Sequence, residues 1–240
     1  VILGVFMRVK IKKRHQKLLL LQRIDLISEK QRTIRKKFGR FLFTNFFVNF
    51  FISQKEIENK INDEFLKEFN SIKSYLPKSS KNILDIGCGL GVINIYLNDY
   101  YSKKSYFTLI DKNYVDKKVA YGFNNNSESY NKLEITKDFL ILNGLKTEQL
   151  QLINADENFV LNNKYELIIS LFSMGYHYSI KNYIDIIKKI STKSTKVIFD
   201  LSMEYNELNK VKKYFNKVVI IKNDDEVKQN YLRLLCSEIK

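Results

Sequence analysis

The stretch "NILDIGCGLGVINIYL", residues 82–97, combines an apolar run, a turn with three closely spaced glycines and a second apolar run. This pattern predicts a buried strand that leads through a tight turn into a helix. In an open parallel sheet, a glycine-rich turn after the first strand forms the floor of a ligand crevice. Glycines let a ligand approach the backbone, and the helix that starts near Gly91 offers N–H groups to a negative group. A tight turn with a purely structural role is the alternative.

On both sides of this turn, short apolar runs alternate with stretches of helical periodicity. Expected strands lie at 82–86, 106–110, 150–153, 166–171, 195–201, 217–221 and 230–238. Expected helices lie at 54–76, 91–100, 133–143, 180–191 and 204–214. The alternation predicts an α/β fold, a mostly parallel seven-stranded sheet with helices on both faces. The last two strands lack a helix between them, so we expect an antiparallel hairpin at the sheet edge.

The charge of the chain is concentrated near its N-terminus. The net charge is +15, and residues 1–40 hold 13 Lys/Arg against 2 Asp/Glu, whereas residues 41–240 hold 28 against 24. We therefore expect a basic, Phe-rich extension (residues 1–53) and one catalytic domain (residues 54–240). The basic run predicts a solvated, partly disordered tail, in which His15 is solvated and not catalytic. The alternative is that residues 8–40 bind RNA phosphates or an anionic membrane surface.

Two apolar segments of the extension are too short for the roles that they superficially suggest. "FLFTNFFVNFFI" (41–52) has twelve residues, whereas a bilayer span takes about 20. Its phenylalanines recur at helical spacing, which predicts one apolar helix face that packs in a core, or alternatively lies in a membrane interface. "KLLLLQ" (17–22) is too short for a secretory signal, so a cytoplasmic location is expected, with peripheral membrane attachment as the alternative. Because the chain begins with Val and Met7 opens "MRVKIKKR", no function is expected in residues 1–6.

The spacing of the glycines narrows the ligand class. Gly87, Gly89 and Gly91 form G-x-G-x-G two residues after Asp85, while Val92 occupies the place of the third glycine of a dinucleotide fingerprint. "LDIGCGLG" resembles motif I of the class I S-adenosylmethionine (SAM)-dependent methyltransferases. The resemblance covers roughly residues 80–240 and implies a Rossmann-like sheet and SAM as the cofactor.

Further residues match the donor site that this resemblance implies. Asp111 ends the second strand, twenty residues after Gly91, where a carboxylate can accept hydrogen bonds from ribose hydroxyls. Asp156 follows the third strand at the family's position for binding the adenine amino group. An ordinary strand-end aspartate and a helix N-cap are the respective alternatives. The resemblance also places these residues at the donor site: Cys88, Lys112, Ala155, Glu157 and Ser170.

The end of the fourth strand, "YELIISLFSMGYHYS" (165–179), bears on the methyl acceptor. Methyltransferases of nucleobase amino groups commonly carry Asn or Asp, two prolines and an aromatic residue there, whereas this chain has Ser170, Leu171, Phe172 and Ser173. A metal-assisted mechanism would need several acidic residues, of which only Asp200 is present. We therefore expect neither nucleobase N-methylation nor a metal.

His177 follows this strand between Tyr176 and Tyr178, and Gly175 is expected to leave the backbone free to aim it. A histidine with an ordinary pKa is a suitable base for a hydroxyl acceptor near neutral pH. The alternative is a structural histidine beneath the polar loop expected at 121–133. Tyr176 and Tyr178 are expected to bind a sugar or to pack. A weaker resemblance to bacterial sugar and small-molecule O-methyltransferases favours a carbohydrate or other small-molecule acceptor; RNA methylation and donor binding without catalysis are the alternatives.

Overall fold

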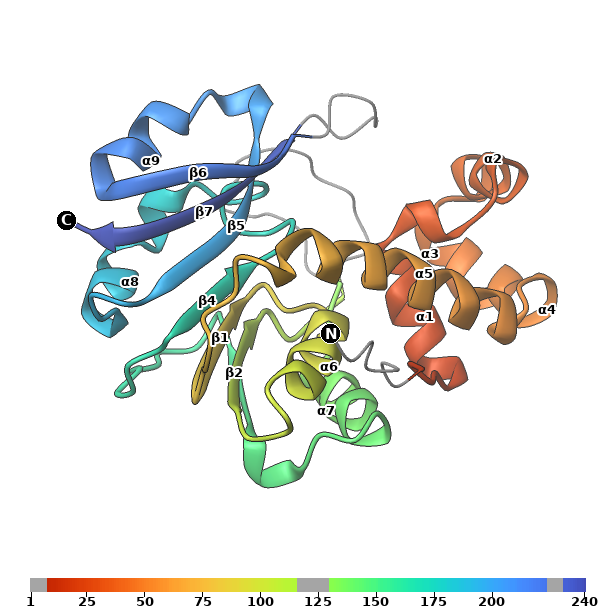
Figure 1. Ribbon diagram of the computed structural model, residues 1–240. Helices are drawn as coiled ribbons and strands as arrows, with labels where there is room; N and C mark the ends of the chain where they lie inside the picture. The colour runs from red at the N-terminus through yellow and green to blue at the C-terminus, as the bar shows by residue number, and fades with distance from the viewer. Residues whose placement is uncertain (1–7, 116–129, 224–230) are drawn as a thin grey trace.

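The computed structural model describes residues 8–115, 130–223 and 231–240, and its centre is one twisted sheet (Figure 1). The strands are β1 (Asn82–Ile86), β2 (Tyr106–Asp111), β3 (Leu150–Asn154), β4 (Leu167–Ser170), β5 (Lys196–Ser202), β6 (Phe215–Asn223) and β7 (Tyr231–Ile239). They lie in the order β3-β2-β1-β4-β5-β7-β6. Only the pairings of β5 with β7 and of β7 with β6 are antiparallel. The predicted α/β, Rossmann-like sheet with a C-terminal antiparallel hairpin is confirmed.

Helices cover both faces of the sheet. They are α5 (Gln54–Lys73), α6 (Val92–Tyr100), α7 (Leu133–Leu142), α8 (Ile184–Ile190) and α9 (Leu208–Tyr214). Successive side chains of a strand point to opposite faces, and the two faces have separate cores. Ile83 of β1 packs in the core formed with α5, α6 and α7, whereas its neighbour Leu84 packs in the core formed with α8 and α9. The strands are apolar on both faces because both faces are covered.

The chain passes from β1 outward to β3 and then returns to the other side of β1 as β4. The strand order therefore reverses between β1 and β4. In open α/β sheets, a crevice forms beyond the carboxyl ends of the strands at such a reversal. The glycine-rich turn after β1 and the segment after β4 lie on its two sides.

Two predicted helices are shorter than their periodicity indicates. Ile180–Asn182 form a 3-10 turn before α8, and Met203–Tyr205 form another before α9. Asn206 has φ of +47°, which separates the second turn from its helix. Most of the loop predicted at 121–133 lies outside the described residues, and α7 begins at its end.

The N-terminal segment consists of helices packed on the domain. They are α1 (Lys13–Gln22), a 3-10 turn η1 (Ile24–Leu26), α2 (Glu29–Phe38), α3 (Arg40–Leu42), a π-helical turn η2 (Phe43–Phe47) and α4 (Val48–Phe51). Leu18, Leu19 and Leu20 are buried in the same core as α5 and β1. The predicted solvated tail is therefore wrong from residue 8 onward, because the leucines of α1 supply a buried face. The boundary predicted between residues 53 and 54 lies between helices that share this core.

The polar residues of α1 also attach it to the domain. His15 is fully buried, and its Nε2 lies 2.7 Å from a carboxylate oxygen of Asp138 on α7. Arg14 Nε donates to the same carboxylate at 3.0 Å. Burial lowers the pKa of His15, although Asp138 opposes this shift. The prediction that His15 is solvated is wrong, and its role is structural.

The predicted apolar face over 41–52 divides into two. Phe43 and Val48 are buried, whereas Phe46 is 68% exposed and Phe50 is 73% exposed. The phenylalanines thus do not share one helix face: Phe43 points toward the domain, whereas Phe46 and Phe50 point toward solvent. Among the described residues, no helix has the length and apolar character that crossing a membrane requires.

Candidate functional site

Two adjoining pockets occupy the crevice, with volumes of about 320 and 370 Å³. One lies over the glycine turn, and the other lies between the ends of β2 and β3 and the segment after β4. Residues that line both pockets are Gly87, Asp111, Ser173, His177 and Tyr178. The crevice therefore brings together residues predicted for the donor and residues predicted for the acceptor.

Glycines are required in the turn after β1 for two different reasons. Gly87 has φ of +71°, and a Cβ there would lie 2.0 Å from Ser173 Oγ, so the segment after β4 needs its absence. Gly89 has φ of +53°, and a Cβ there would lie 2.9 Å from Gln22 Oε1 of α1. Gln22 Oε1 accepts a hydrogen bond from the Leu90 N–H at 3.1 Å. Gly87 thus has the structural role that was the alternative interpretation, and Gly89, which lines the first pocket, leaves room for Gln22 of α1.

Asp111 lies at the end of β2 against this floor. One carboxylate oxygen, Oδ2, accepts from the Gly89 N–H at 2.6 Å and from Asn131 Nδ2 at 3.1 Å; Oδ1 accepts from the Lys112 N–H at 2.8 Å. Burial raises the pKa of Asp111 to about 6, although these hydrogen bonds favour the charged form. Asp111 is therefore a fixed acceptor on the wall shared by both pockets.

Asn131 belongs to the site and was not predicted. Its Nδ2 also donates to the Gly89 carbonyl at 2.8 Å, and Thr136 Oγ1 of α7 donates to the same carbonyl at 2.9 Å. The two side chains hold the turn from the α7 side. The only sequence signal was the position of Asn131 at the end of the polar stretch before α7.

Asp85 and Cys88 line the first pocket. The Asp85 carboxylate is buried and accepts from Asn94 Nδ2 at 2.6 Å, and burial raises its pKa to about 7. Burial also raises the pKa of the Cys88 thiol, with Asp111 as a further cause. The raised pKa favours the protonated, less nucleophilic form of the thiol. Gly91 begins α6 at the same pocket with φ of +76°.

Of the residues predicted for the adenine end of the donor site, some line a pocket and one does not. Lys112, Ala155 and Asp156 line the second pocket, and Lys112 Nζ lies 3.8 Å from an Asp156 carboxylate oxygen. No helix follows Asp156, so its alternative interpretation as an N-cap is wrong. Glu157 lines neither pocket, and its carboxylate accepts from Asn154 Nδ2 at 2.9 Å.

Ser170 lies beneath the crevice. It is fully buried, donates to the Ile86 carbonyl at 2.6 Å, accepts from the Met174 N–H at 2.9 Å and lines neither pocket. Its hydroxyl joins β4 to β1 and fixes the start of the segment that carries His177.

The segment from Ser173 to Tyr178 forms a tight turn that presents His177. The Ser173 carbonyl accepts from the His177 N–H at 2.8 Å, and the Gly175 N–H donates to the Tyr178 carbonyl at 2.6 Å. A Cβ at Gly175 would lie 2.8 Å from the Asp200 carbonyl oxygen, and φ there is +81°. Gly175 therefore fixes this turn against β5. The expectation that it leaves the backbone free is wrong.

His177 and its neighbours form the acceptor side of the site. Its side chain is partly exposed, and the pKa is lowered by the surrounding protein and by Arg40. The Tyr176 ring lies 4.9 Å from the imidazole and 5.4 Å from the Phe172 ring. Arg40 of α3 lines the same pocket, and its Cζ lies 4.3 Å from the centre of the Tyr130 ring. Sequence analysis missed Arg40 because only the fold brings α3 to the pocket.

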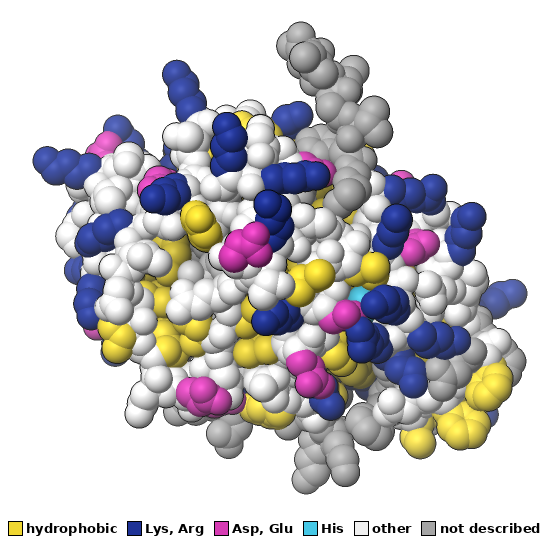
Figure 2. Space-filling model, turned by 90° about the horizontal axis from the view of Figure 1, so that it is seen from below, with side chains coloured by type: hydrophobic (Ala, Val, Ile, Leu, Met, Phe, Trp, Pro, Cys, Tyr) yellow, Lys and Arg dark blue, Asp and Glu magenta, His cyan; other side chains and the backbone are white. Residues whose placement is uncertain are grey.

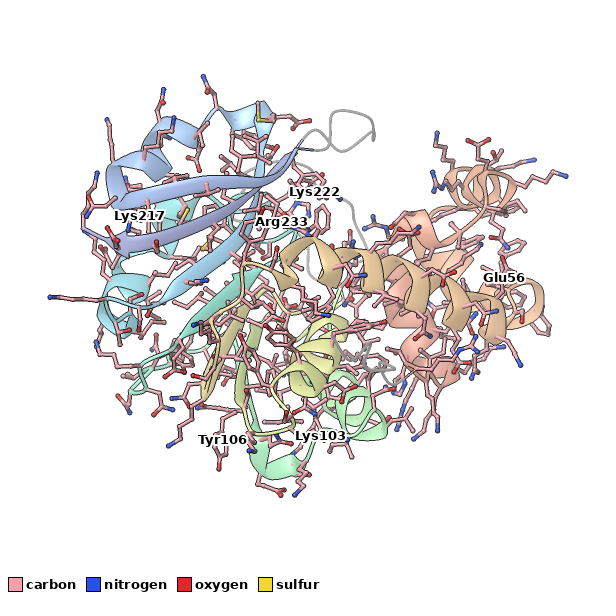
Figure 3. The ribbon with its side chains drawn as sticks, in the orientation of Figure 1. Glu56, Lys103, Tyr106, Lys217, Lys222 and Arg233 are labelled. Carbon is pink, nitrogen blue, oxygen red and sulfur yellow. The ribbon has the colours of Figure 1, made fainter. Side chains whose placement is uncertain are left out.

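A buried ionic network supports the floor. Arg233 of β7 lies beside α5 (Figure 3) and donates through Nε and Nη2 to the two carboxylate oxygens of Asp200, at 2.7 and 2.8 Å. It also reaches Glu68 at 3.2 Å, and Glu68 accepts from Arg23 at 3.0 Å. Asp200 is thus bound by arginine. No three His, Cys, Asp or Glu side chains of the described residues gather as a metal site requires, and the absence of a metal stays a prediction.

Comparison with protein-family models gives no match, and comparison with curated proteins gives none. The structure is similar to a Nostoc punctiforme protein assigned as an O-methyltransferase, with TM-score 0.52 and 10% identity over 77% of this chain and 58% of that one. A ribosomal protein L11 methylase of Lactobacillus delbrueckii subsp. bulgaricus gives TM-score 0.46 and 16% identity over 71% and 75% of the two chains. A 16S rRNA methyltransferase of T. thermophilus, in complex with AdoMet and guanosine, gives TM-score 0.49 and 10% identity, over 72% of this chain and 42% of that one. The fold is that of the class I SAM-dependent methyltransferases.

Proposed function

We propose that the chain is a SAM-dependent methyltransferase whose acceptor is a hydroxyl of a sugar or another small molecule. The observation that supports this most is that Gly89, Asp111 and His177 line one pocket although they follow three different strands. The glycine floor and the fixed carboxylate suit a donor with a ribose diol, and the histidine suits an acceptor that loses a proton.

The described residues fit the donor at both ends of the crevice. Gly89 offers backbone without a side chain, and Asp111 offers carboxylate oxygens on the wall between the pockets. Lys112, Ala155 and Asp156 would border the adenine end, and Asp85 lies at the opposite end. When bound, SAM supplies a methyl group on a positively charged sulfur. The chain's contribution is chiefly to align donor and acceptor, which is worth up to about 7–11 kcal/mol in well-oriented systems.

His177 is assigned the proton transfer. Its lowered pKa keeps the imidazole neutral near neutral pH, so a ring nitrogen can accept the proton of an acceptor hydroxyl. Tyr176 and Tyr178 offer aromatic surface beside it for a sugar ring or another small molecule. The histidine thus serves as general base, and both tyrosines position the acceptor.

The RNA alternative receives less support from the basic residues of the N-terminal segment. Lys12 and Arg14 pair with Asp138, and Arg23 pairs with Glu68. Part of the charge that would bind phosphates is therefore used within the protein. Salt-dependent RNA binding remains the outcome that would favour this alternative.

Calorimetry with SAM tests the donor site. Asp111→Asn should weaken donor binding by about 1.5–3 kcal/mol, because it removes a charged hydrogen-bond acceptor. The matched control is Asp185→Asn, at an exposed position on α8, which should leave the dissociation constant unchanged. Equal affinities of the two variants would remove Asp111 from the site.

Transfer is tested separately with labelled SAM and pools of sugars, other hydroxyl compounds and RNA. Label in a hydroxyl compound supports the proposal. Label in RNA alone would support the alternative acceptor. Donor binding without transfer to any pool would favour a donor-binding protein without catalysis.

A further inference from the structure

Five large apolar side chains on the N-terminal helices are exposed to solvent. Each follows the previous one by four residues: Ile34 (37% exposed), Phe38 (45%), Leu42 (58%), Phe46 (68%) and Phe50 (73%). We call this set the apolar stripe. The Phe46 and Phe50 rings lie 6.1 Å apart, and Phe38 lies 4.9 Å from Phe47. Exposed apolar surface of this extent marks an interaction site.

The apolar stripe is distinct from the buried side chains that pack these helices on the domain. From Arg40 to Phe51 the chain is continuously helical through α3, the π turn η2 and α4. Phe43, Thr44 and Val48 on the inner face are buried, so packing on the domain is already provided. Figure 2 shows hydrophobic side chains gathered at the right-hand edge, the side on which α2 and α4 lie in Figure 1.

The surroundings of the apolar stripe are basic. Residues 29–51 hold six Lys/Arg and one Asp/Glu, and Glu29 is that single acid. Lys30 and Lys37 are exposed on α2: Lys30 lies one turn before Ile34, and Lys37 Nζ lies 6.0 Å from the centre of the Phe38 ring. An aromatic surface with lysines around it is complementary to the interface of an anionic bilayer, where rings enter the headgroup region and cations meet lipid phosphates. A second copy of the chain would bring the same positive charge to this surface.

We propose that the apolar stripe, with Lys30 and Lys37, docks the protein on an anionic lipid bilayer. Phe46 and Phe50 enter the boundary between headgroups and acyl chains, and the lysines bind the lipid phosphates. Arg40 of α3 lines the pocket, whereas none of the five stripe residues does, so docking leaves the pocket lining uncovered. The proposal is independent of the reaction, since neither donor nor acceptor takes part in docking.

Flotation of the full chain with vesicles tests the proposal. Vesicles of phosphatidylcholine mixed with phosphatidylglycerol should bind the protein, whereas phosphatidylcholine alone should bind it much less. Phe46→Ser/Phe50→Ser should lower the partition coefficient by about tenfold or more. Lys30→Glu/Lys37→Glu should lower it by about 25-fold or more, from about fivefold for each lysine removed from an anionic surface.

Matched controls change the same chemistry elsewhere on the surface. Val219→Ser/Ile220→Ser replaces two apolar residues of β6 that are 47% and 49% exposed. Lys212→Glu/Lys213→Glu reverses two exposed lysines of α9. Both controls should bind vesicles like the parent chain, and melting temperatures should confirm that all four variants are folded.

Four outcomes would overturn the proposal. The first is no binding to anionic vesicles, and the second is binding that Phe46→Ser/Phe50→Ser leaves unchanged. In the third, Phe46→Ser/Phe50→Ser abolishes self-association of a chain that does not bind vesicles, so the stripe is an interface between copies. In the fourth, Lys30→Glu/Lys37→Glu abolishes retention on RNA of a chain that does not bind vesicles, so the surface binds nucleic acid instead.

Discussion

His177 lines both pockets, and its imidazole forms no hydrogen bond with the residues that the structure describes. The turn from Ser173 to Tyr178 fixes its backbone. The ring is thus held at the pockets while its nitrogens form no hydrogen bond within the described residues. A histidine whose role was structural would be expected to use a ring nitrogen internally. The ring nitrogens of His177 are therefore available for the proton transfer that we propose.

If His177 is the general base, His177→Ala should lower turnover by about 10²–10⁴-fold. The dissociation constant of SAM and the melting temperature should stay close to the parent values. Because the pKa of His177 lies below its ordinary value, turnover of the parent enzyme should rise with pH in the acidic range and be level at neutral pH. Kinetics with an acceptor found in the screen would measure both effects. Loss of stability with a pH profile of unchanged shape would instead indicate a structural histidine.

Among the individual residues of the site, those that belong to a local sequence motif could be predicted from the sequence. The glycines follow β1, and Asp85 and Asp111 lie in the last two residues of β1 and β2, so their meeting in one crevice is a consequence of a parallel sheet. Gln22, Arg40 and Asn131 could not be predicted in the same way. They reach the site through packing of α1, α3 and the segment before α7, for which the sequence has no local signal.

At the scale of elements, the turn after β4 is held by close packing on β5. Gly175 and Gly39 allow a direct test, since both have φ of +81° but different surroundings. A Cβ at Gly175 would meet the Asp200 carbonyl and the Phe199 ring, whereas no described atom lies within 4 Å of a Cβ at Gly39. The pair separates backbone strain from steric overlap.

We expect Gly39→Ala to lower the free energy of unfolding by about 1–3 kcal/mol through backbone strain alone, because φ of +81° with ψ of +155° is a conformation essentially restricted to glycine. Gly175→Ala should cost about 1–3 kcal/mol more, because the added methyl group must displace β5 or the turn. Urea denaturation of the two variants measures the difference. Equal losses would mean that the turn adapts and that His177 is less rigidly placed than its contacts indicate.

The elements differ in how well their sequence predicts them. The strands and the hairpin were predicted because both faces are covered, which makes their apolar runs nearly continuous. The N-terminal helices were predicted as a solvated tail because the segment is strongly basic, although its leucines form a buried helix face. Charges of α1 are bound by Asp138 of α7, more than a hundred residues away in the chain.

At the scale of the whole molecule, the core on the α5, α6 and α7 face of the sheet includes residues from Val9 to Ile198. A matched pair of leucines tests whether the N-terminal helices belong to it. Leu20→Ala, at a position 1% exposed, should lower the free energy of unfolding by about 2–5 kcal/mol. Leu42→Ala, at a position 58% exposed, should change it by less than about 0.5 kcal/mol. If denaturation showed both changes to be neutral, α1 would be detached from the domain in solution.

The attachment of α1 to α7 has a consequence for how the chain is made. His15 leaves the ribosome 123 residues before Asp138, which at about 5–20 residues per second is a delay of about 6–25 s. During that time the leucines of α1 have no domain to cover them. The nascent chain therefore presents an apolar, basic helix to its surroundings, and a chaperone or a membrane surface that binds it would protect it until the sheet is complete.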